Sequence, residues 1–292
     1  MITPKSQSKS PLNQHSDPTH QVKSPSTGEP NAIDTVRMTI EVLENQQHLS
    51  LARSMEKRMT IDGVTYKIAN CRKEREDAFR LCHDMYVKAG LMPANQIGMR
   101  ASPFHLLPTT DIFLAYHDDQ PIYTMTLISD DEIGIPMQKV FDDEMIRYRA
   151  QTDVFFAEVS SLASQVGYFP RRRMFQVFVR LASLMVQSAR ENGVERLLIA
   201  CLRHHARFYK MFLGFRQIFN EQMYTSVGKL AVGCEHDFAR NDRDHYKLYN
   251  AIYDSPFRNW ELYHQPMLQE DRDYFREMTE QFNQGFPLES VH

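Results

Sequence analysis

Two stretches of this sequence place a residue that could exchange a proton among apolar side chains. Val154 to Leu162, VFFAEVSSL, holds a single carboxylate, Glu158, in a run of apolar and small residues. His204 to Phe215, HHARFYKMFLGF, holds Tyr209 in a segment rich in aromatic residues. A positioned carboxylate can accept a proton, and a positioned phenol can donate one. We therefore take these two stretches as the candidate centre of the protein.

Three consecutive arginines, Arg171, Arg172 and Arg173, stand at the start of a predicted helix. Cations at a helix N-terminus oppose the helix dipole at a cost of roughly a few tenths of a kcal/mol each. An anion that meets the arginines would offset this cost, so they form a candidate site for an anionic partner. The alternative is a basic turn that is simply solvated.

No metal site is predicted. His204 and His205 are adjacent, so in a helix their side chains diverge by about 100° and cannot grip one ion together. The acidic run from Asp142 to Glu144 is typical of the first turn of a helix. The four cysteines, none in CxxC spacing, indicate reduced and mostly buried thiols; they are Cys71, Cys82, Cys201 and Cys234.

The apolar pattern predicts alternating strands and helices around these residues. In the first half we expect a strand from Val64, a helix over Arg72 to Ala89, a long loop over Leu91 to Pro108, and two strands over Asp111 to Asp130 joined by a tight turn at Asp118 to Pro121. The loop is long enough to suggest function. A short segment then leads into the acidic helix.

The second half carries the candidate centre. We expect a buried strand over Val154 to Ala163, a helix over Arg172 to Asn192, a buried strand over Glu195 to Leu202, a short helix ended by Gly214, and one long strand over Met223 to Asp237. Glycine is the residue that most readily ends a helix with a positive φ. The order strand, helix, strand, helix sets the fold.

Length and composition predict a sizeable core, because 42% of the 292 residues are hydrophobic. The net charge of -3 provides no overall basic field for binding nucleic acid. No run approaches the ~18 apolar residues of a membrane span, and the N-terminus lacks the apolar centre of a signal peptide. We expect a cytoplasmic protein.

The domain organisation follows from composition. Residues 1–32 are rich in Ser, Pro, Gln, Thr and Lys and are expected to be a disordered tail. Residues 33–60 are predicted to form a linker with a helix, and residues 61–238 the main domain. Residues 239–292 are charged, aromatic and helical in outline, and are predicted to be a C-terminal extension.

The predicted order of elements resembles the GNAT acyltransferase fold, an α/β (α+β) fold with a mixed, mostly antiparallel central sheet flanked by helices. Within it, a more specific resemblance is to the long-chain N-acyl amino acid synthases of the N-acyltyrosine synthase type, relatives of the acyl-homoserine-lactone synthases. It covers about Tyr66 to Asp237. The motifs are REDAFRLCHDMYVKAGL, TTDIFLAY, GIPMQKVF, FFAEVSSLA and RHHARFYKMFLGF, followed by Tyr224 and a long strand.

The resemblance implies transfer of a fatty acyl group from acyl carrier protein to the α-amino group of an amino acid, with tyrosine the best-known acceptor of the family. Glu158 is then the candidate base that deprotonates the acceptor ammonium. Tyr209 matches the tyrosine that protonates the departing thiolate. Backbone amides along the strand would polarise the thioester carbonyl; these are at Val159, Ser160, Ser161 and Leu162.

The donor is predicted to be an acyl carrier protein and not free coenzyme A. Members that use coenzyme A usually have a glycine-rich turn before the long helix, where backbone amides hold the pyrophosphate. Here the segment reads QVGYFPRRRM, with only Gly167. Arg171 to Arg173 would instead receive the phosphopantetheine phosphate or the acidic carrier. No bound cofactor and no metal are expected.

Further residues are assigned roles by the same resemblance. Arg80 and Asp111 match characteristic charges of the two related families and would orient substrate or serve structure. An acyl channel could be lined by Phe79, Tyr86, Met125, Phe155, Phe175 and Phe178. For most of these six residues, ordinary core packing is the favoured interpretation. The arginine that often follows the family's glutamate is absent, since this sequence continues as Val159-Ser160-Ser161.

Several alternatives remain open. Tyr209 could be a packed aromatic residue, and Glu158 could form a structural pair with an arginine such as Arg80. A second enzyme hypothesis is an autoinducer synthase that acylates S-adenosylmethionine and closes a lactone. A third hypothesis is a non-catalytic module that binds acyl carrier protein.

Overall fold

The computed structural model describes residues 60–131, 133–225, 228–254 and 256–283. The predicted tail and nearly all of the predicted linker helix lie outside the described residues. The strands are β1 (Thr60–Ile61), β2 (Val64–Ile68), β3 (Thr110–His117), β4 (Gln120–Ser129), β5 (Phe156–Ser164), β6 (Arg196–Leu202), β7 (Arg216–Tyr224) and β8 (Lys229–Asp237). The helices are α2 (Arg72–Lys88), α3 (Asp142–Gln151), α4 (Arg171–Glu191), α5 (Arg203–Leu213), α6 (Phe238–Asp244), α7 (Tyr249–Tyr253) and α8 (Gln269–Asn283), with 3-10 turns η1 (Pro103–Leu106), η2 (Pro136–Lys139) and η3 (Asn259–Glu261).

The strands form one sheet in the order β1-β2-β3-β4-β5-β6-β8-β7. All neighbouring strands are antiparallel except β5 and β6, which are parallel. The prediction of a mixed, mostly antiparallel sheet is therefore confirmed. Parallel neighbours need a crossover connection, and the long helix α4 provides it.

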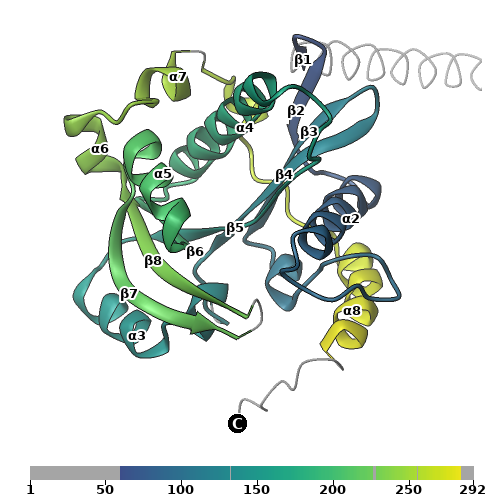
Figure 1. Cartoon of the computed structure of the whole chain (residues 1–292), viewed down its shortest axis with the longest axis horizontal. Coiled ribbons are helices and arrows are strands. Elements are labelled where there is room, and N and C mark those ends of the chain that lie inside the picture. The colour runs from purple at the N-terminus through teal and green to yellow at the C-terminus, as the bar shows by residue number, and fades with distance from the viewer. Residues whose placement is uncertain (1–59, 132, 226–227, 255, 284–292) are drawn as a thin grey trace, which may run out of the picture. The chain divides into compact units, whose positions relative to one another are not determined.

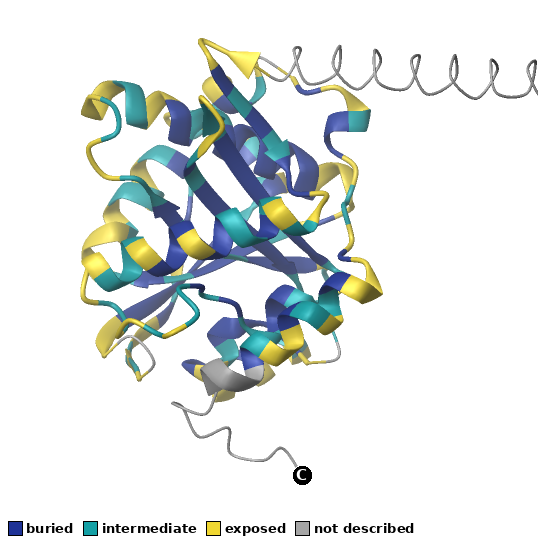
Figure 2. Ribbon diagram, turned by 90° about the vertical axis from the view of Figure 1, so that its right-hand side faces the viewer, coloured by how far each residue is buried: buried dark blue, intermediate teal, exposed yellow. Residues whose placement is uncertain are grey.

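Helices cover both faces of the sheet (Figure 1). Successive side chains of a strand point to opposite faces, and β3 shows both environments. Phe113 and Ala115 pack with residues of α4, whereas Ile112 and Leu114 pack with residues of α2. Figure 2 shows the strands buried between helices whose outward faces are exposed. This double burial explains why the strands read as nearly continuous apolar runs.

The parallel strands β5 and β6 part from each other within the sheet. Their register runs from Phe156 opposite Arg196 to Glu158 opposite Leu198. In the described residues no further pair follows, although β5 continues to Ser164 and β6 to Leu202. The sheet therefore opens directly beyond Glu158, at the C-terminal ends of two parallel strands.

Two local predictions are confirmed by backbone geometry. The β3–β4 hairpin turns at Asp118 and Asp119, with φ of 49° and 58°. Two successive positive φ values match the twist of a tight hairpin, and aspartate tolerates them better than most residues. Gly214 ends α5 with φ of 69°, and its N–H bonds back to the carbonyl of Tyr209. This glycine cap fixes where α5 stops.

The predicted long strand from Met223 to Asp237 is wrong. The structure contains a hairpin instead, in which β7 and β8 pair with Tyr224 opposite Lys229. The chain reverses between Tyr224 and Gly228. The Gly228 N–H donates to the Tyr224 carbonyl at 2.8 Å, and the φ of Gly228 is 64°. The turn residues are few and lie between two β-favouring runs, so periodicity alone did not separate the strands.

The C-terminal residues pack onto the main domain through both faces of the sheet. On one side, α7 contacts α4, where the Gln187 side chain donates to the carbonyl of Ile252 at 2.7 Å. On the other side, α8 lies against α2, with the rings of Phe275 and Phe79 edge to face at 5.1 Å. A buried arginine of α2, Arg75, pairs with Asp271 of α8 at 3.2 Å. The C-terminal segment thus completes the core.

His264 provides a pH-sensitive part of this attachment. Its Nδ1 lies 2.8 Å from Oδ2 of Asp111, and its Nε2 bonds to the carbonyl of Pro108. Both partners are acceptors, so both ring nitrogens need a proton. The hydrogen bond to Asp111 raises the pKa of His264 above its usual value. A raised pKa in the folded state gives stability that is fully present below the unfolded pKa of about 6.5 and is lost as the pH rises through the folded value.

Replacing His264 with glutamine should therefore destabilise the protein most at low pH. We expect a melting temperature a few degrees below that of the wild type near pH 5.5, since a half-exposed pair contributes up to about 1 kcal/mol. The difference should shrink by pH 8.5. Thermal unfolding of both proteins across this range measures it. A difference that is constant or grows with pH would contradict the proposed imidazolium.

Candidate active site

A cavity of about 230 Å³ lies where β5 and β6 part. Its wall has both apolar and polar side chains. An apolar side is formed by residues of α4 and by residues of the same hydrophobic cluster; these are Met125, Phe178, Ala182, Met185, Ile199, Leu213 and Phe215. Polar side chains also stand in the wall, namely Tyr86, Arg100, Glu158, Ser160, Ser161, His205, Tyr209 and Tyr224. A cavity of this kind suits a molecule with an apolar part and a charged part.

Glu158 is fixed in the wall by the strand and by η2. Only 2% of the residue is exposed, and its Oε2 accepts a hydrogen bond from the Met137 N–H at 2.6 Å. Burial raises the pKa of Glu158 to about 8, although the Met137 N–H and the charge of Arg100 act in the opposite direction. A base is most effective when its pKa lies near the working pH. Within the described residues Glu158 forms no ion pair.

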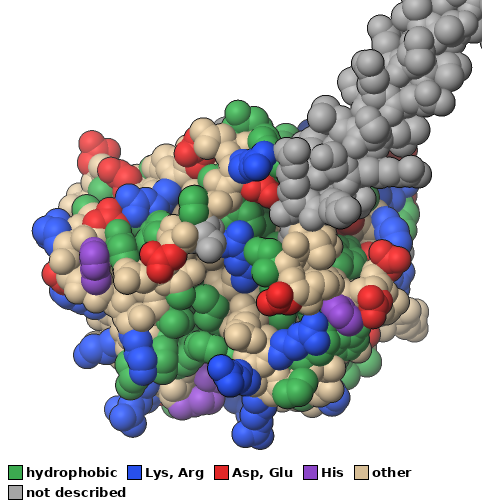
Figure 3. Space-filling model, turned by 90° about the horizontal axis from the view of Figure 1, so that it is seen from above, with side chains coloured by type: hydrophobic (Ala, Val, Ile, Leu, Met, Phe, Trp, Pro, Cys, Tyr) green, Lys and Arg blue, Asp and Glu red, His purple; other side chains and the backbone are tan. Residues whose placement is uncertain are grey.

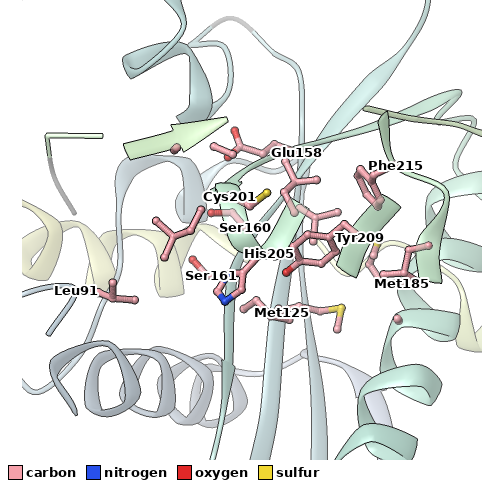
Figure 4. Close-up of a pocket in the computed structure, with 18 of the residues that line it drawn as sticks. Leu91, Met125, Glu158, Ser160, Ser161, Met185, Cys201, His205, Tyr209 and Phe215 are labelled. Atoms are coloured by element: carbon pink, nitrogen blue, oxygen red, sulfur yellow. The ribbon is translucent and has the colours of Figure 1, made fainter. Parts of the chain in front are cut away.

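Tyr209 reaches the same cavity from α5 (Figure 4). Its ring packs against Phe208 at 5.6 Å and Phe215 at 5.8 Å between centroids. Burial, with smaller contributions from Cys201 and Tyr123, raises its pKa. The phenol therefore stays protonated at neutral pH and is available as a donor. Tyr209 is a packed aromatic residue, as the alternative interpretation states, but its ring also lines the cavity.

An irregularity of β5 shapes the wall between these two residues. Thr126 pairs with Ser160 and Thr124 with Ala163, so β5 has one residue more than β4 between the same two pairs. Such a bulge leaves a residue out of the ladder and bends the strand. Ser161 takes φ of 51°, a value that is uncommon and strained for serine. Val159 to Leu162 all line the cavity, so their backbone lies beside the site.

A buried hydrogen-bond network fixes the Ser161 side chain. The Ser102 N–H donates to Nδ1 of His105 at 3.1 Å, so the ring proton must be on Nε2. That Nε2 donates to Ser161 Oγ at 3.0 Å, and Nη1 of Arg100 donates to the same oxygen at 2.9 Å. Burial lowers the pKa of His105 to about 3, which keeps the ring neutral. The serine hydroxyl hydrogen is thus left for another acceptor.

Arg100, which sequence analysis did not single out, comes from the long loop before β3. Its N–H donates to the Phe79 carbonyl at 3.0 Å, which attaches the loop to α2. Its guanidinium carbon lies 4.7 Å from the centre of the Tyr86 ring. Asn95 holds the turn before it by accepting from the Gly98 N–H at 2.8 Å. The only indication in the sequence was the length of the loop, which suggested a function for the loop but did not identify Arg100.

Several residues predicted for the site lie elsewhere. Phe79 packs against His105 and Phe275 in the core between α2 and α8, and Phe155 and Phe175 are 43% and 38% exposed. Arg80 donates to the Ile97 carbonyl at 3.4 Å, and Asp111 binds the C-terminal segment. None of the five lines the cavity, whereas Tyr86, Met125 and Phe178 do. An aromatic side chain in the sequence is compatible with the cavity wall and with the core, so residue type alone did not distinguish the two.

The three arginines stand at the start of α4, outside the cavity. Arg171 and Arg172 are exposed. Arg173 stacks on Phe169 at 3.7 Å and donates to the Asp62 carbonyl at 3.0 Å. Figure 3 shows basic side chains interspersed with acidic and apolar ones on the face seen from above. Any anion site on that face would therefore be local.

The described residues contain neither a metal-binding cluster nor a helix that could span a membrane. No group of three or more His, Cys, Asp or Glu side chains is placed to hold a metal ion. No helix in the described part of the chain has the length and apolar character needed to cross a membrane.

Known proteins similar to this chain share its fold. Residues 77–237, more than half of the chain, match the family model for the N-acyl amino acid synthase FeeM. The solved structure of FeeM, an N-acyl amino acid synthase from uncultured soil microbes, is similar with a TM-score of 0.53 and 22% identity, over 63% of this chain and 95% of that one. This similarity and the mixed sheet confirm the predicted GNAT-like fold.

Other solved structures are similar at lower scores. The AHL synthase LasI has a TM-score of 0.49 and 14% identity, over 67% of this chain and 96% of that one. An acyl-CoA N-acyltransferase from Pseudomonas aeruginosa has a TM-score of 0.42 and 13% identity, over 59% of this chain and 99% of that one. No curated protein matched the chain.

Proposed function

Since this chain belongs to the FeeM family of N-acyl amino acid synthases, we propose that it transfers a long-chain fatty acyl group from a carrier-protein thioester to the α-amino group of an amino acid. The observation that carries this proposal is the placement of Glu158 and Tyr209 in one cavity at the opening between β5 and β6. One residue can accept a proton there and the other can donate one.

In the proposed mechanism the acceptor ammonium first gives a proton to Glu158, directly or through one water. The free amine then attacks the thioester carbonyl, so that a C–N bond forms and the oxygen becomes negative. Backbone amides at the bulge of β5 support this oxyanion. The attacking nitrogen then loses its second proton to solvent, the C–S bond breaks, and Tyr209 protonates the departing thiolate. Transfer of the proton from Glu158 to the tyrosinate, through solvent, restores both groups.

The apolar side of the cavity supports a fatty acyl donor. Met125, Phe178 and Met185 can bury part of a hydrocarbon chain, and each buried methylene contributes about 0.8 kcal/mol. For the donor head group we propose an acyl carrier protein. The support is the sequence around the start of α4, where exposed arginines replace the glycine-rich turn that would hold a free nucleotide pyrophosphate.

Mass analysis of lipid extracts tests the reaction directly. Bacteria that express the wild-type chain, the Glu158→Gln variant or an empty vector are extracted and compared. We expect long-chain N-acyl amino acids only with the wild type, and the product masses identify both substrates. Purified protein offered the acyl group on carrier protein or on coenzyme A then identifies the donor.

Two outcomes would replace the proposal. Acyl-homoserine lactones made from added S-adenosylmethionine would identify an autoinducer synthase. Extracts identical to the control, with tight binding of acylated carrier protein by both wild type and Glu158→Gln, would identify a non-catalytic module.

A further inference from the structure

Arg100 is a cation in the wall of the cavity that forms no ion pair with an acidic side chain of the described residues. Its guanidinium stacks on Tyr86, and Nη1 donates to Ser161 Oγ at 2.9 Å. It also lies close enough to the Cys82 thiol to interact with it. No Asp or Glu of the described residues lies within ion-pair distance of it. An arginine has five N–H donors, so these contacts leave donors for a ligand.

The cavity also has only one acidic side chain among its described lining residues, and this is Glu158. The Arg100 guanidinium is near enough to Glu158 to act against the rise of its pKa, yet the two side chains form no ion pair within the described residues. An α-amino acid carries the complementary arrangement, with an ammonium and a carboxylate on one carbon. On the premise of the proposed acyl transfer, we propose that Arg100 binds the α-carboxylate of the acceptor while Glu158 takes the proton from its amino group.

Three features support this assignment. Arginine matches carboxylates with two parallel hydrogen bonds, a geometry that lysine cannot reproduce. The Tyr86 ring and the Ser161–His105 network hold the guanidinium in place before a ligand arrives, which lowers the cost of ordering it on binding. The backbone N–H of Arg100 is itself anchored to α2.

The test compares an accepted amino acid with the amine that lacks its carboxylate, for example tyrosine with tyramine if tyrosine is a substrate. We expect the wild type to prefer the amino acid by about 10- to 100-fold in kcat/KM, the range expected for a charge-assisted hydrogen bond. Arg100→Met should remove most of this preference by raising KM for the amino acid, with little change for the amine. Arg100→Lys should restore part of it.

Controls separate this role from a structural one. Arg147→Met removes a guanidinium that is 62% exposed on α3 and does not line the cavity, and it should keep the wild-type preference. A purely structural Arg100 would lower activity with the amino acid and the amine equally. A wild type that uses the two acceptors equally well would overturn the proposal without any variant.

Calorimetry without an acyl donor keeps this inference distinct from the proposed reaction. The amino acid should bind the wild type and Arg147→Met, and should bind Arg100→Met about 10- to 100-fold more weakly. If no acyl transfer occurs but this pattern is seen, the reaction is wrong and the carboxylate site stands. If transfer occurs but binding does not depend on Arg100, the carboxylate site is wrong and the reaction stands.

Discussion

Replacing Glu158 with glutamine should lower the rate of acyl transfer by about 10²- to 10⁴-fold, the range typical of losing a general base. Glutamine has nearly the same shape, and its carbonyl can still accept the Met137 N–H that Oε2 accepts now. The acceptor ammonium would then have no carboxylate to receive its proton. Steady-state kinetics with a fixed acyl donor measure the loss.

The pH profile identifies the base. Glu158 must be ionised to accept a proton, and its pKa is raised to about 8. We therefore expect kcat/KM of the wild type to rise with pH up to about 8 and then to level. The variant should lose this rise, and any rise that remains belongs to the acceptor ammonium itself. A variant with wild-type activity and an unchanged profile would eliminate Glu158 as the base.

Stability supplies an independent check that Glu158 is buried with its proton. Its pKa rises from 4.5 in the unfolded reference to about 8 in the folded protein, so the wild type should lose stability as the pH increases between these values. The glutamine variant has no such group. Its melting temperature relative to the wild type should therefore be higher at pH 8.5 than at pH 4.5, and a reversed trend would show that Glu158 is ionised at low pH.

Replacing Tyr209 with phenylalanine should lower kcat by about 10²-fold, the lower end of general acid catalysis. The loss is smaller than for Glu158 because a thiol has a pKa of about 8.5, and its thiolate can leave without prior protonation. The ring should keep its packing against Phe208 and Phe215, so the fold should persist. Single-turnover kinetics with saturating acceptor measure the effect on the chemical step.

A donor with a poorer leaving group makes this prediction sharper. An oxygen-ester analogue releases an alkoxide, which is far more basic than a thiolate, so Tyr209→Phe should impair it more than the thioester. Tyr263→Phe, an exposed tyrosine outside the cavity, is the matched control and should behave as the wild type. Equal losses with both donors would show that Tyr209 positions the substrate and does not protonate the leaving group.

Local patterns in the sequence were enough to locate most elements of the fold. The apolar run around Glu158 and the apolar faces of α4 predicted a strand and a helix because burial imposes those periodicities. Gly214 and the Asp118-Asp119 turn were predictable because few residues accept their backbone angles. The β7–β8 hairpin was missed, since its turn lies between two strands that read as one. The resemblance of the motifs then indicated the family.

The site itself depended on contacts between residues far apart in the chain. That Glu158 and Tyr209 share a cavity follows from the separation of β5 and β6, which no local pattern encodes. Arg100 lies in the wall of the cavity because its loop is hydrogen-bonded to α2. Asp111 lies outside the cavity, where it binds His264 and Gln265. The order of amino acids sets which chemical groups the chain has and which segments carry them. Which of these groups meet, and that Glu158 is buried without a counter-ion among the described residues, follows from the fold, because burial and pairing are set by packing between distant segments.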